Sequence, residues 1–242
     1  MQIVVDGVLT NYEIIGNKPK TLIILHGWMR SLNEWLPIAK ELSNHYQVIL
    51  LDLPGFGKTV LPQTDYSIYE YADFVERFLD KLGIHKVSLL GHSFGGRIGI
   101  ILAAKRNRIN NLILVDAAGV EELSNIAKLK IATFKSARLV VPKPYAENLR
   151  NKFGSSDYKS SGAMRNIFLK TINEDLSYLL PQIDVPTLLI WGNKDTEISE
   201  SKIRKMNKLI KDSTLRIVWE SGHSPHLEKP KELIEILEEY PF

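Results

Sequence analysis

The fold is decided by residues 89–100, which read LLGHSFGGRIGI. A short apolar run ends at Gly91, and a stretch with helical spacing follows Gly95. Ser93 lies between the two glycines and completes the pattern G-x-S-x-G. Glycines on both sides of a serine let a strand and a helix approach closely and allow a tight turn between them. We therefore predict a sharp strand-to-helix turn that lifts the hydroxyl of Ser93 above the edge of a sheet.

Outward from this turn, short buried runs alternate with stretches of helical periodicity. The predicted strands are residues 2–5, 8–15, 21–26, 46–53, 86–91, 111–116, 185–192 and 214–220, of which the first two form a hairpin turning at Asp6 and Gly7. The predicted helices are residues 33–45, 67–83, the segment after Ser93, residues 199–210 and the segment from Pro230. Strands that alternate with helices indicate right-handed crossovers. The predicted fold class is α/β, with a mostly parallel sheet of roughly eight strands and helices on both faces.

One segment, residues 120–184, interrupts this alternation. It shows no buried strand pattern, but it contains amphipathic helical stretches, for example residues 163–172. It is too long for a structureless loop in a compact domain. We interpret it as a helical cap, inserted after the sixth strand and lying over the carboxyl edge of the sheet. The predicted domains are a first part of the core at residues 1–119, the cap at 120–184, and a second part of the core at 185–242.

Reactive side chains follow the predicted strands at one edge of the sheet, where ligands bind in folds of this kind. The residues at these positions are His26, Gly27, Trp28, Asp52, Ser93, Asp116, Asp195 and His223. A serine hydroxyl is a poor nucleophile without a base. His223 follows the last strand, in a glycine-containing loop free to turn back over the sheet. It is therefore our candidate base, and the other five histidines are interpreted as structural or solvated.

The imidazole needs an acid that fixes its tautomer. Asp195 follows the penultimate strand, and Asp116 also ends a strand at the same edge. The order Ser93, Asp195, His223 along the chain is serine, acid, histidine. We therefore predict Asp195 as the acid and keep Asp116 as the alternative.

Acyl transfer also requires donors for a developing oxyanion. We predict the backbone N–H of Phe94, which opens the helix after the serine, and the backbone N–H of Trp28, in the loop after the strand at 21–26. The candidate pocket residues are His26 and, from the cap, Phe134, Tyr145, Phe153, Met164 and Phe168.

Composition excludes several classes of protein. The chain has 242 residues, a formal net charge of +3 and no cysteine, so disulfides and thiolate metal sites are excluded. The sequence MQIVVDGVLT lacks the basic start and apolar core of a signal peptide, and no apolar run is long enough to span a bilayer. We expect a cytoplasmic protein without metal or cofactor, and no nucleic-acid partner because no recognition motif is present.

The chain resembles the α/β-hydrolase superfamily, in the compact esterase and C–C hydrolase branch with a helical cap between strands six and seven. The resemblance covers nearly the whole chain. It rests on LHGW at residues 25–28, LDLPGFGKT at 51–59, GHSFGG at 91–96, WGNKD at 191–195 and SGHSPHLEKP at 221–230. It implies the fold and a Ser-Asp-His triad, and it says much less about the substrate.

Branches of the superfamily differ at individual positions. Haloalkane dehalogenases and epoxide hydrolases carry an aspartate nucleophile, and Ser93 argues against both. Meta-cleavage C–C hydrolases often have an aromatic residue directly after the catalytic histidine, where this chain has Ser224. The HGW sequence resembles the biotin-pathway esterase that demethylates a pimeloyl chain bound to acyl-carrier protein, although tryptophan there also occurs in other branches.

We expect a cofactor-free serine hydrolase for small-molecule carboxylic esters of short to medium acyl chain. The alternatives are a C–C bond hydrolase, an esterase for an anionic or carrier-protein-bound ester, and a hydrolase-fold small-molecule receptor. Residues 126–172 contain ten Lys or Arg and two acidic residues. One explanation of this charge is a solvated helical face. The alternative, functional hypothesis is that the cap steers an anionic substrate or an acidic carrier protein to the site.

Overall fold

The computed structural model describes residues 1–62, 64–120, 162–172 and 174–240. Its strands are β1 (Gln2–Val5), β2 (Val8–Ile15), β3 (Thr21–Leu25), β4 (Gln47–Leu51), β5 (Val87–His92), β6 (Ile109–Val115), β7 (Thr187–Gly192) and β8 (Ser213–Val218). Its α-helices are α1 (Leu36–Leu42), α2 (Ile68–Lys81), α3 (Phe94–Lys105), α7 (Arg165–Ile172), α8 (Glu200–Leu209), α9 (Pro225–Glu228) and α10 (Pro230–Glu239). Short 3-10 helices are η1 (Leu32–Trp35), η2 (Gly162–Met164) and η3 (Leu180–Gln182).

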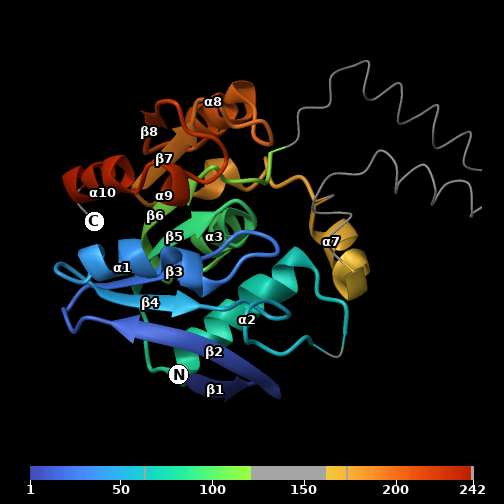
Figure 1. Cartoon of the computed structure of the whole chain (residues 1–242). Coiled ribbons are helices and arrows are strands. Elements are labelled where there is room, and N and C mark those ends of the chain that lie inside the picture. Colours follow the sequence, from blue (N-terminus) through green and yellow to red (C-terminus); the bar gives the residue numbers. More distant parts are fainter. Residues whose placement is uncertain (63, 121–161, 173, 241–242) are drawn as a thin grey trace, which may run out of the picture.

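The strands form one eight-stranded sheet in the order β1-β2-β4-β3-β5-β6-β7-β8 (Figure 1). The β1–β2 and β2–β4 pairs are antiparallel, and every other neighbouring pair is parallel. The hairpin turns at Asp6 and Gly7, both with positive φ, so that Val5 pairs with Val8. The predicted α/β class, the mostly parallel sheet and the two-residue hairpin are confirmed.

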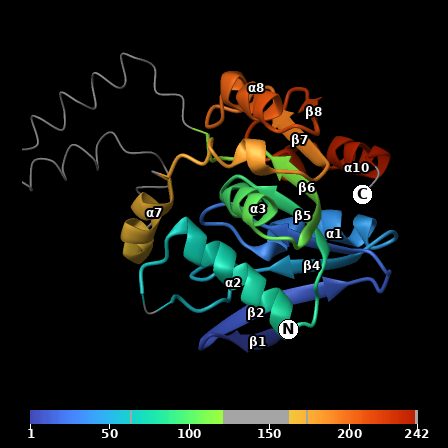
Figure 2. The same cartoon turned by 180° about the vertical axis from the view of Figure 1, so that it is seen from behind.

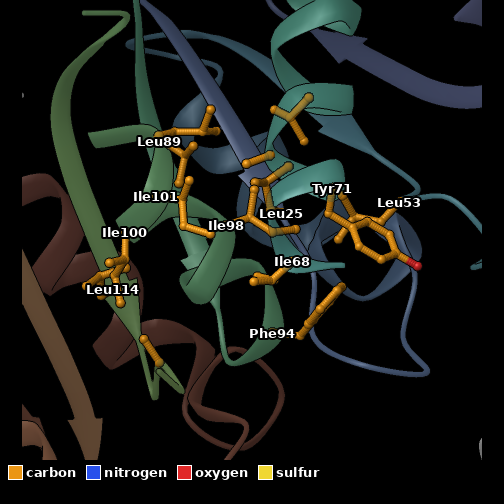
Figure 3. Close-up of a cluster of buried hydrophobic side chains, with 14 of the residues drawn as sticks. Leu25, Leu53, Ile68, Tyr71, Leu89, Phe94, Ile98, Ile100, Ile101 and Leu114 are labelled. Atoms are coloured by element: carbon orange, nitrogen blue, oxygen red, sulfur yellow. The ribbon is translucent and has the colours of Figure 1, made fainter. Parts of the chain in front are cut away.

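Helices cover both faces of the sheet, as Figures 1 and 2 show from opposite sides. On β3, Leu22 and Ile24 are buried with α1 and α10, whereas Ile23 and Leu25 are buried with α2, α3 and α8. This alternation follows from the two-residue period of a strand. Both sets of side chains are removed from water, which explains why these strands are continuous apolar runs in the sequence. Figure 3 shows the larger cluster, in which Phe94 and Ile98 of α3 pack near Leu25.

Helix α2 lies within the helix predicted at residues 67–83. The hydroxyl of Ser67 accepts a hydrogen bond from the Glu70 N–H, and the Glu70 carboxylate accepts one from the Ser67 N–H, which forms a capping box. The helix ends at Lys81, and Gly83 beyond it has a φ of +69°. A glycine readily adopts this left-handed conformation after a helix.

Only part of the predicted cap belongs to the described residues. Residues 121–161 lie outside them. Helix α7 lies within the predicted helical stretch, and Phe168 on it packs against Trp28 with ring centroids 5.0 Å apart. The part of the cap that is described therefore touches the loop after β3. The domain boundaries at 119/120 and 184/185 remain predictions.

None of the helices in the described part of the chain is both long enough and apolar enough to cross a bilayer.

The glycine after Phe94 lies very close to the central strand β3, and its substitution tests that packing. A Cβ on Gly95 would lie 2.2 Å from the backbone oxygen of Leu25 in the central strand β3. We expect Gly95→Ala to destabilise the fold by about 3 kcal/mol. The melting temperature should then fall by roughly 6–12 °C.

Gly83→Ala is the matched control, because its Cβ meets no atom within 4 Å and only its positive φ opposes the change. This control should cost about 1 kcal/mol. Equal losses for the two variants in thermal unfolding followed by circular dichroism would contradict the steric account.

Candidate active site

Ser93 stands on the turn between β5 and α3. Its φ is +48° and its ψ is −106°, a strained conformation for a residue with a side chain. The turn is held by backbone hydrogen bonds, from the Ser93 N–H to the Val115 carbonyl and from the Ala118 N–H to the Ser93 carbonyl. A Cβ on Gly91 would lie 2.5 Å from the Gly95 carbonyl oxygen, and a Cβ on Gly95 would meet Leu25, so neither position has room for a side chain. The predicted strand-to-helix turn is therefore present, with Ser93 at its tip.

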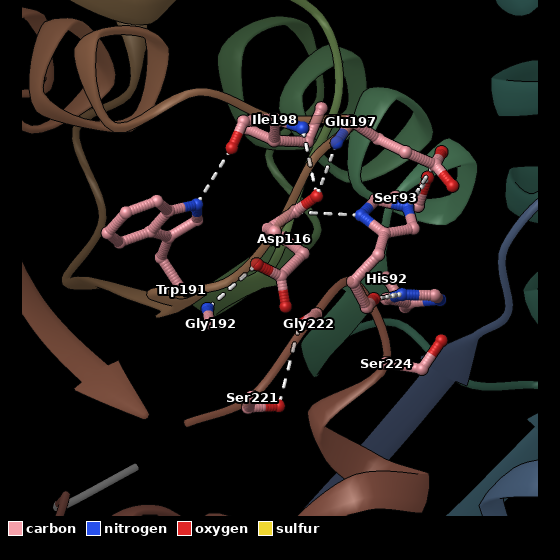
Figure 4. A network of polar contacts seen from close by, with 12 residues as sticks. His92, Ser93, Asp116, Trp191, Gly192, Glu197, Ile198, Ser221, Gly222 and Ser224 are labelled. Atoms are coloured by element: carbon pink, nitrogen blue, oxygen red, sulfur yellow. Dashed lines mark hydrogen bonds and ion pairs between the residues drawn. The ribbon is translucent and has the colours of Figure 1, made fainter. Parts of the chain in front are cut away.

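The loop after β8 brings His223 onto Ser93, although 130 residues separate them. The imidazole Nε2 lies 2.9 Å from the Ser93 Oγ, and Nδ1 lies 2.8 Å from the Asp195 Oδ2 (Figure 4). The structure therefore places the three predicted residues in one hydrogen-bonded chain. With Asp195 ionised, Nδ1 carries the proton, and Nε2 accepts a hydrogen bond from the serine hydroxyl.

Asp195 is held by its own loop between β7 and α8. Its Oδ1 accepts hydrogen bonds from the backbone N–H groups of Glu197 at 2.7 Å and Ile198 at 3.0 Å. Burial by itself raises the pKa of Asp195, but the hydrogen bond and charge of His223, together with these two N–H groups, lower the pKa below its ordinary value. The carboxylate therefore stays ionised at neutral pH and can stabilise a positively charged imidazolium.

Asp116, the alternative acid, lies beneath this chain at the end of β6. Its side chain is fully buried, and its Oδ1 accepts a hydrogen bond from the Gly192 N–H at 2.9 Å. Burial raises the pKa of Asp116 to about 9; the Gly192 N–H opposes this rise, and the neighbouring charge of Asp195 adds to it. The geometry thus assigns the ionised partner of His223 to Asp195, and Asp116 is protonated below it.

The raised pKa of Asp116 makes a prediction for stability. The group ionises near 3.8 in the unfolded chain and near 9 in the folded one, so unfolding releases a proton between these values. Its contribution to the free energy of unfolding therefore falls as pH rises through this window, by up to about 1.4 kcal/mol per pH unit. Asp116→Asn keeps the shape of the side chain and cannot ionise. The melting temperature of this variant relative to that of the parent chain should therefore rise from pH 5 to pH 9.

Asp184→Asn, at an exposed site, serves as the control and should show no such trend. A melting-temperature difference between Asp116→Asn and the parent chain that stays constant with pH would contradict a protonated Asp116.

The two residues that carry the predicted oxyanion donors pack against each other. The Phe94 N–H is the first of α3, where N–H groups have no acceptor within the helix. The Trp28 ring packs edge-on against Phe94 with ring centroids 5.1 Å apart, and against Phe56 at 4.9 Å. This aromatic packing fixes the loop after β3 beside the serine. The role of the two N–H groups remains a proposal.

A cavity of about 440 Å³ opens on Ser93. Its lining is Trp28, Ser93, Phe94, Arg97, Ala118, Phe168, Ile172, Thr196, Glu197 and Ile198. Among the predicted pocket residues, Phe168 lines it. Met164 is buried and approaches Gly55 instead. Phe134, Tyr145 and Phe153 lie outside the described residues.

His26 does not line this cavity. It is fully buried, its Nδ1 donates to the Gly27 carbonyl at 2.7 Å, and its Nε2 accepts from the Leu53 N–H at 3.0 Å. Burial lowers the pKa of His26, so the ring is neutral. The neighbouring Asp52 carboxylate accepts hydrogen bonds from the Leu32 and Lys58 N–H groups. Together these two side chains tie the loops after β3 and β4 to each other, which is a supporting role for the candidate site.

Two other histidines support the loop that carries His223. The Nε2–H of His92 donates to the backbone carbonyl of His223 at 2.8 Å, and the His226 ring stacks on Trp35 with centroids 4.2 Å apart. Burial, with the charges of His226 and His223, holds the pKa of His92 well below its usual range. Both rings lie within the protein, in accord with their interpretation as structural. Sequence reasoning did not find the contact between His92 and His223, because the two are 131 residues apart.

Sequence reasoning also missed two charged residues of the cavity. Arg97 lies one helical turn after Ser93, and its guanidinium donates to the backbone carbonyls of Ile172 and Glu174. Glu197 lies two residues after Asp195, and its Oε2 is 3.5 Å from Nε2 of His223. Their proximity in sequence to Ser93 and Asp195 is the signal that could have identified them.

Asp116, Asp195 and His223 are also the one group in the described part whose spacing suits a metal ion, with ligand atoms within 4.8 Å of one another. The short hydrogen bond between Nδ1 and Asp195, together with a protonated Asp116, explains the same arrangement without an ion.

A serine on a strained strand-to-helix turn, bonded to a histidine from the last loop of an eight-stranded sheet, defines the class of α/β hydrolases. The chain belongs to this family, because the family model described as alpha/beta hydrolase fold matches residues 20–166. The resemblance inferred from the sequence is thereby confirmed, and the chain is a hydrolase by family.

Similar proteins cover nearly the whole chain. A solved membrane phospholipase A, described as a bacterial virulence factor, is 28% identical, with 98% of this chain and 84% of that chain covered and a TM-score of 0.80. A monoacylglycerol lipase from Mus musculus is 25% identical over 93% of this chain and 76% of its own length. A meta-cleavage product hydrolase from Pseudomonas fluorescens is 23% identical, with 98% of this chain and 95% of that chain covered and a TM-score of 0.76. At this identity, the likeness shows a shared fold alone.

Proposed function

We propose that this chain is a serine hydrolase that cleaves carboxylic esters through an acyl-enzyme intermediate. The observation that carries the proposal is the chain of hydrogen bonds from Ser93 to His223 to Asp195, with distances of 2.9 and 2.8 Å. A hydroxyl bonded to an imidazole that is oriented by an ionised carboxylate is an activated nucleophile. The similarity to two lipolytic hydrolases supports esters as the substrate class.

Each residue then has a defined role. Ser93 Oγ attacks the ester carbonyl while His223 Nε2 takes its proton, and the N–H groups of Trp28 and Phe94 stabilise the oxyanion. The tetrahedral intermediate collapses, and His223 returns the proton to the leaving alcohol. Water activated by the same Nε2 then attacks the acyl-enzyme and releases the acid. Asp195 keeps the proton of Nδ1 in place throughout.

The size and walls of the cavity support acyl chains of short to medium length. A cavity of about 440 Å³ lies in the range of small-molecule sites, and Trp28, Phe94, Phe168 and Ile172 line it with apolar surface. A C–C bond hydrolase would use the same triad and is the second candidate, supported only at the level of the fold. Ser224 after the histidine argues against it.

The test is hydrolysis of a p-nitrophenyl ester series from acetate to dodecanoate, with vinylogous diketones of similar size as the competing substrates. We expect saturable turnover of esters with a maximum at one chain length and slower cleavage of the diketones. Faster cleavage of the diketones would favour the C–C hydrolase. Tight binding without multiple turnover of either class would favour a receptor.

The hypothesis that a basic cap steers an anionic substrate or an acidic carrier protein stands beside this proposal. Of the ten basic residues, Arg165 and Lys170 belong to the described part, and the Lys170 Nζ donates to the Asp65 carbonyl. Steering predicts that kcat/KM for an ester with an anionic acyl chain falls with added salt, whereas kcat/KM for a neutral ester does not.

A further inference from the structure

Glu197 places a carboxylate against the imidazole nitrogen that does the proton transfer. Its Oε2 lies 3.5 Å from Nε2 of His223, the same atom that lies 2.9 Å from the Ser93 Oγ. Figure 4 shows the Glu197 side chain extending toward Ser93. The side chain is half exposed and lines the 440 Å³ cavity. None of the steps of ester hydrolysis described above requires it.

Hydrogen bonds of the backbone fix the loop that carries this side chain. The Glu197 N–H donates to the Asp195 Oδ1 at 2.7 Å, so the residue is tied to the carboxylate that orients the histidine. The next residue is fixed as well, because the Ile198 carbonyl accepts a hydrogen bond from the Trp191 indole at 2.9 Å. Ser199 then caps helix α8. The carboxylate of Glu197 is therefore carried by a loop with hydrogen bonds at residues 197, 198 and 199.

The geometry also determines which part of a substrate meets Glu197. The leaving oxygen must come within about 3 Å of Nε2 to receive its proton, whereas the carbonyl oxygen points away toward the N–H groups of Phe94 and Trp28. The groups attached to the leaving oxygen therefore pass beside the atom that Glu197 contacts. The alcohol part of the ester therefore lies closer to this negative charge than its acyl chain does.

We propose that Glu197 selects the leaving alcohol by charge, favouring cationic or hydroxyl-bearing neutral alcohols and disfavouring anionic ones. A carboxylate accepts hydrogen bonds and attracts cations, and it repels a carboxylate, phosphate or sulfonate on the departing group. This inference deepens the proposed function and rests on it.

The other charged residue of the cavity does not cancel this preference. The Arg97 guanidinium donates to the carbonyls of Ile172 and Glu174, on the side of the cavity that α7 closes. Glu197 stands instead at the imidazole, with Thr196 beside it in the lining. Because Glu197 is half exposed, solvent and salt reduce its effect, and we expect a discrimination of about tenfold rather than thousands.

The experiment uses three butyrate esters that differ only in the leaving alcohol. Choline is cationic, 3,3-dimethylbutanol is its neutral isostere, and 3-hydroxypropane-1-sulfonate is anionic. Acid release in a pH-stat gives kcat/KM for each ester on one scale. For the wild-type chain, we expect the choline ester to exceed the sulfonate ester by at least about tenfold at low salt. That ratio should shrink as salt is added.

Variants of Glu197 isolate the charge. Glu197→Gln keeps the size of the side chain and should reduce the cation-to-anion ratio by about tenfold, and Glu197→Lys should invert the ratio. The neutral ester reports any general loss of activity, because only the ratio depends on the charge. Glu200→Gln is the matched control: it removes one negative charge three residues away, where Glu200 pairs with Arg204 at the start of α8. The control should leave the ratio within about twofold.

The outcomes separate this inference from the function on which it rests. Turnover that disappears in Ser93→Ala, with a ratio unchanged by Glu197→Gln, would overturn the charge selection and leave the esterase standing. A ratio that shifts equally in Glu200→Gln would overturn it as well, because the effect would then be that of net charge. Absence of Ser93-dependent turnover in the wild-type chain would overturn both proposals.

Discussion

Replacing Ser93 by alanine is expected to lower kcat for the preferred ester by about a million-fold. The variant loses the oxygen that forms the acyl-enzyme, and His223 Nε2 loses its bonding partner at 2.9 Å. The backbone N–H groups of Phe94 and Trp28 and the apolar cavity remain. A residual rate of about a thousandfold over the uncatalysed reaction should therefore persist.

This prediction is measured best in two ways at once. Steady-state hydrolysis gives the loss in kcat, and rapid mixing of the wild-type chain with a p-nitrophenyl ester should show a burst of one p-nitrophenol per protein where deacylation is slow. The burst must be absent in Ser93→Ala. Since Ser93 adopts a φ of +48°, thermal unfolding of the variant shows whether the turn is intact. A folded variant that keeps a tenth of the activity would exclude Ser93 as the nucleophile.

The sequence predicts the layers of this fold because its strands are buried on both faces. Continuous apolar runs such as residues 21–25 and 47–51 have few alternatives to a central parallel strand, and the helices between them have clear apolar stripes. The turn at Ser93 follows from local sterics, because the glycines around it leave room that no other residue would leave. These features are local in the chain, and local features are those that a single sequence reveals.

Contacts across the sheet are less accessible from the sequence. The order of strands predicts that Asp116, Asp195 and His223 share one edge, and the serine-acid-histidine order along the chain favours Asp195, but strand order alone does not choose between the two acids. That choice depends on the turn at Gly192, which donates to Asp116, and on the loop whose N–H groups keep Asp195 ionised. The contacts that His92 and Glu197 make with His223 were missed for the same reason, because these contacts depend on the position of the loop after β8.

The predicted pocket illustrates a different limit. Aromatic residues in an amphipathic segment indicate that one side of the segment is buried, but they do not indicate which part of the protein that side packs against. Phe168 does line the cavity, whereas His26 is buried beneath the loop after β3 with both ring nitrogens bonded to backbone groups. A buried neutral histidine beside a strand end therefore has the same sequence signature as a residue that meets substrate.

Replacing Asp195 by asparagine is expected to lower kcat by about ten thousand-fold while leaving the fold intact. The amide of asparagine can donate toward Nδ1 of His223, which then favours the tautomer that has its proton on Nε2. That tautomer cannot accept the proton of Ser93. The binding of ester should change little, so KM stays near its parent value and the loss appears in kcat. Asp184→Asn, an exposed aspartate, is the control and should retain full activity.

The double variant Asp195→Asn with Asp116→Asn decides whether the buried carboxyl takes any part. Asp116 is protonated in the parent chain because burial and the charge of Asp195 raise its pKa to about 9. Removing that charge lowers the pKa of Asp116, so the group could ionise and replace Asp195 at a longer distance from the imidazole. In that case the single variant keeps a residual activity that rises with pH and that the double variant loses. If Asp116 takes no part, the two variants have equal activity at every pH. Full activity in Asp195→Asn alone would assign the acid to Asp116.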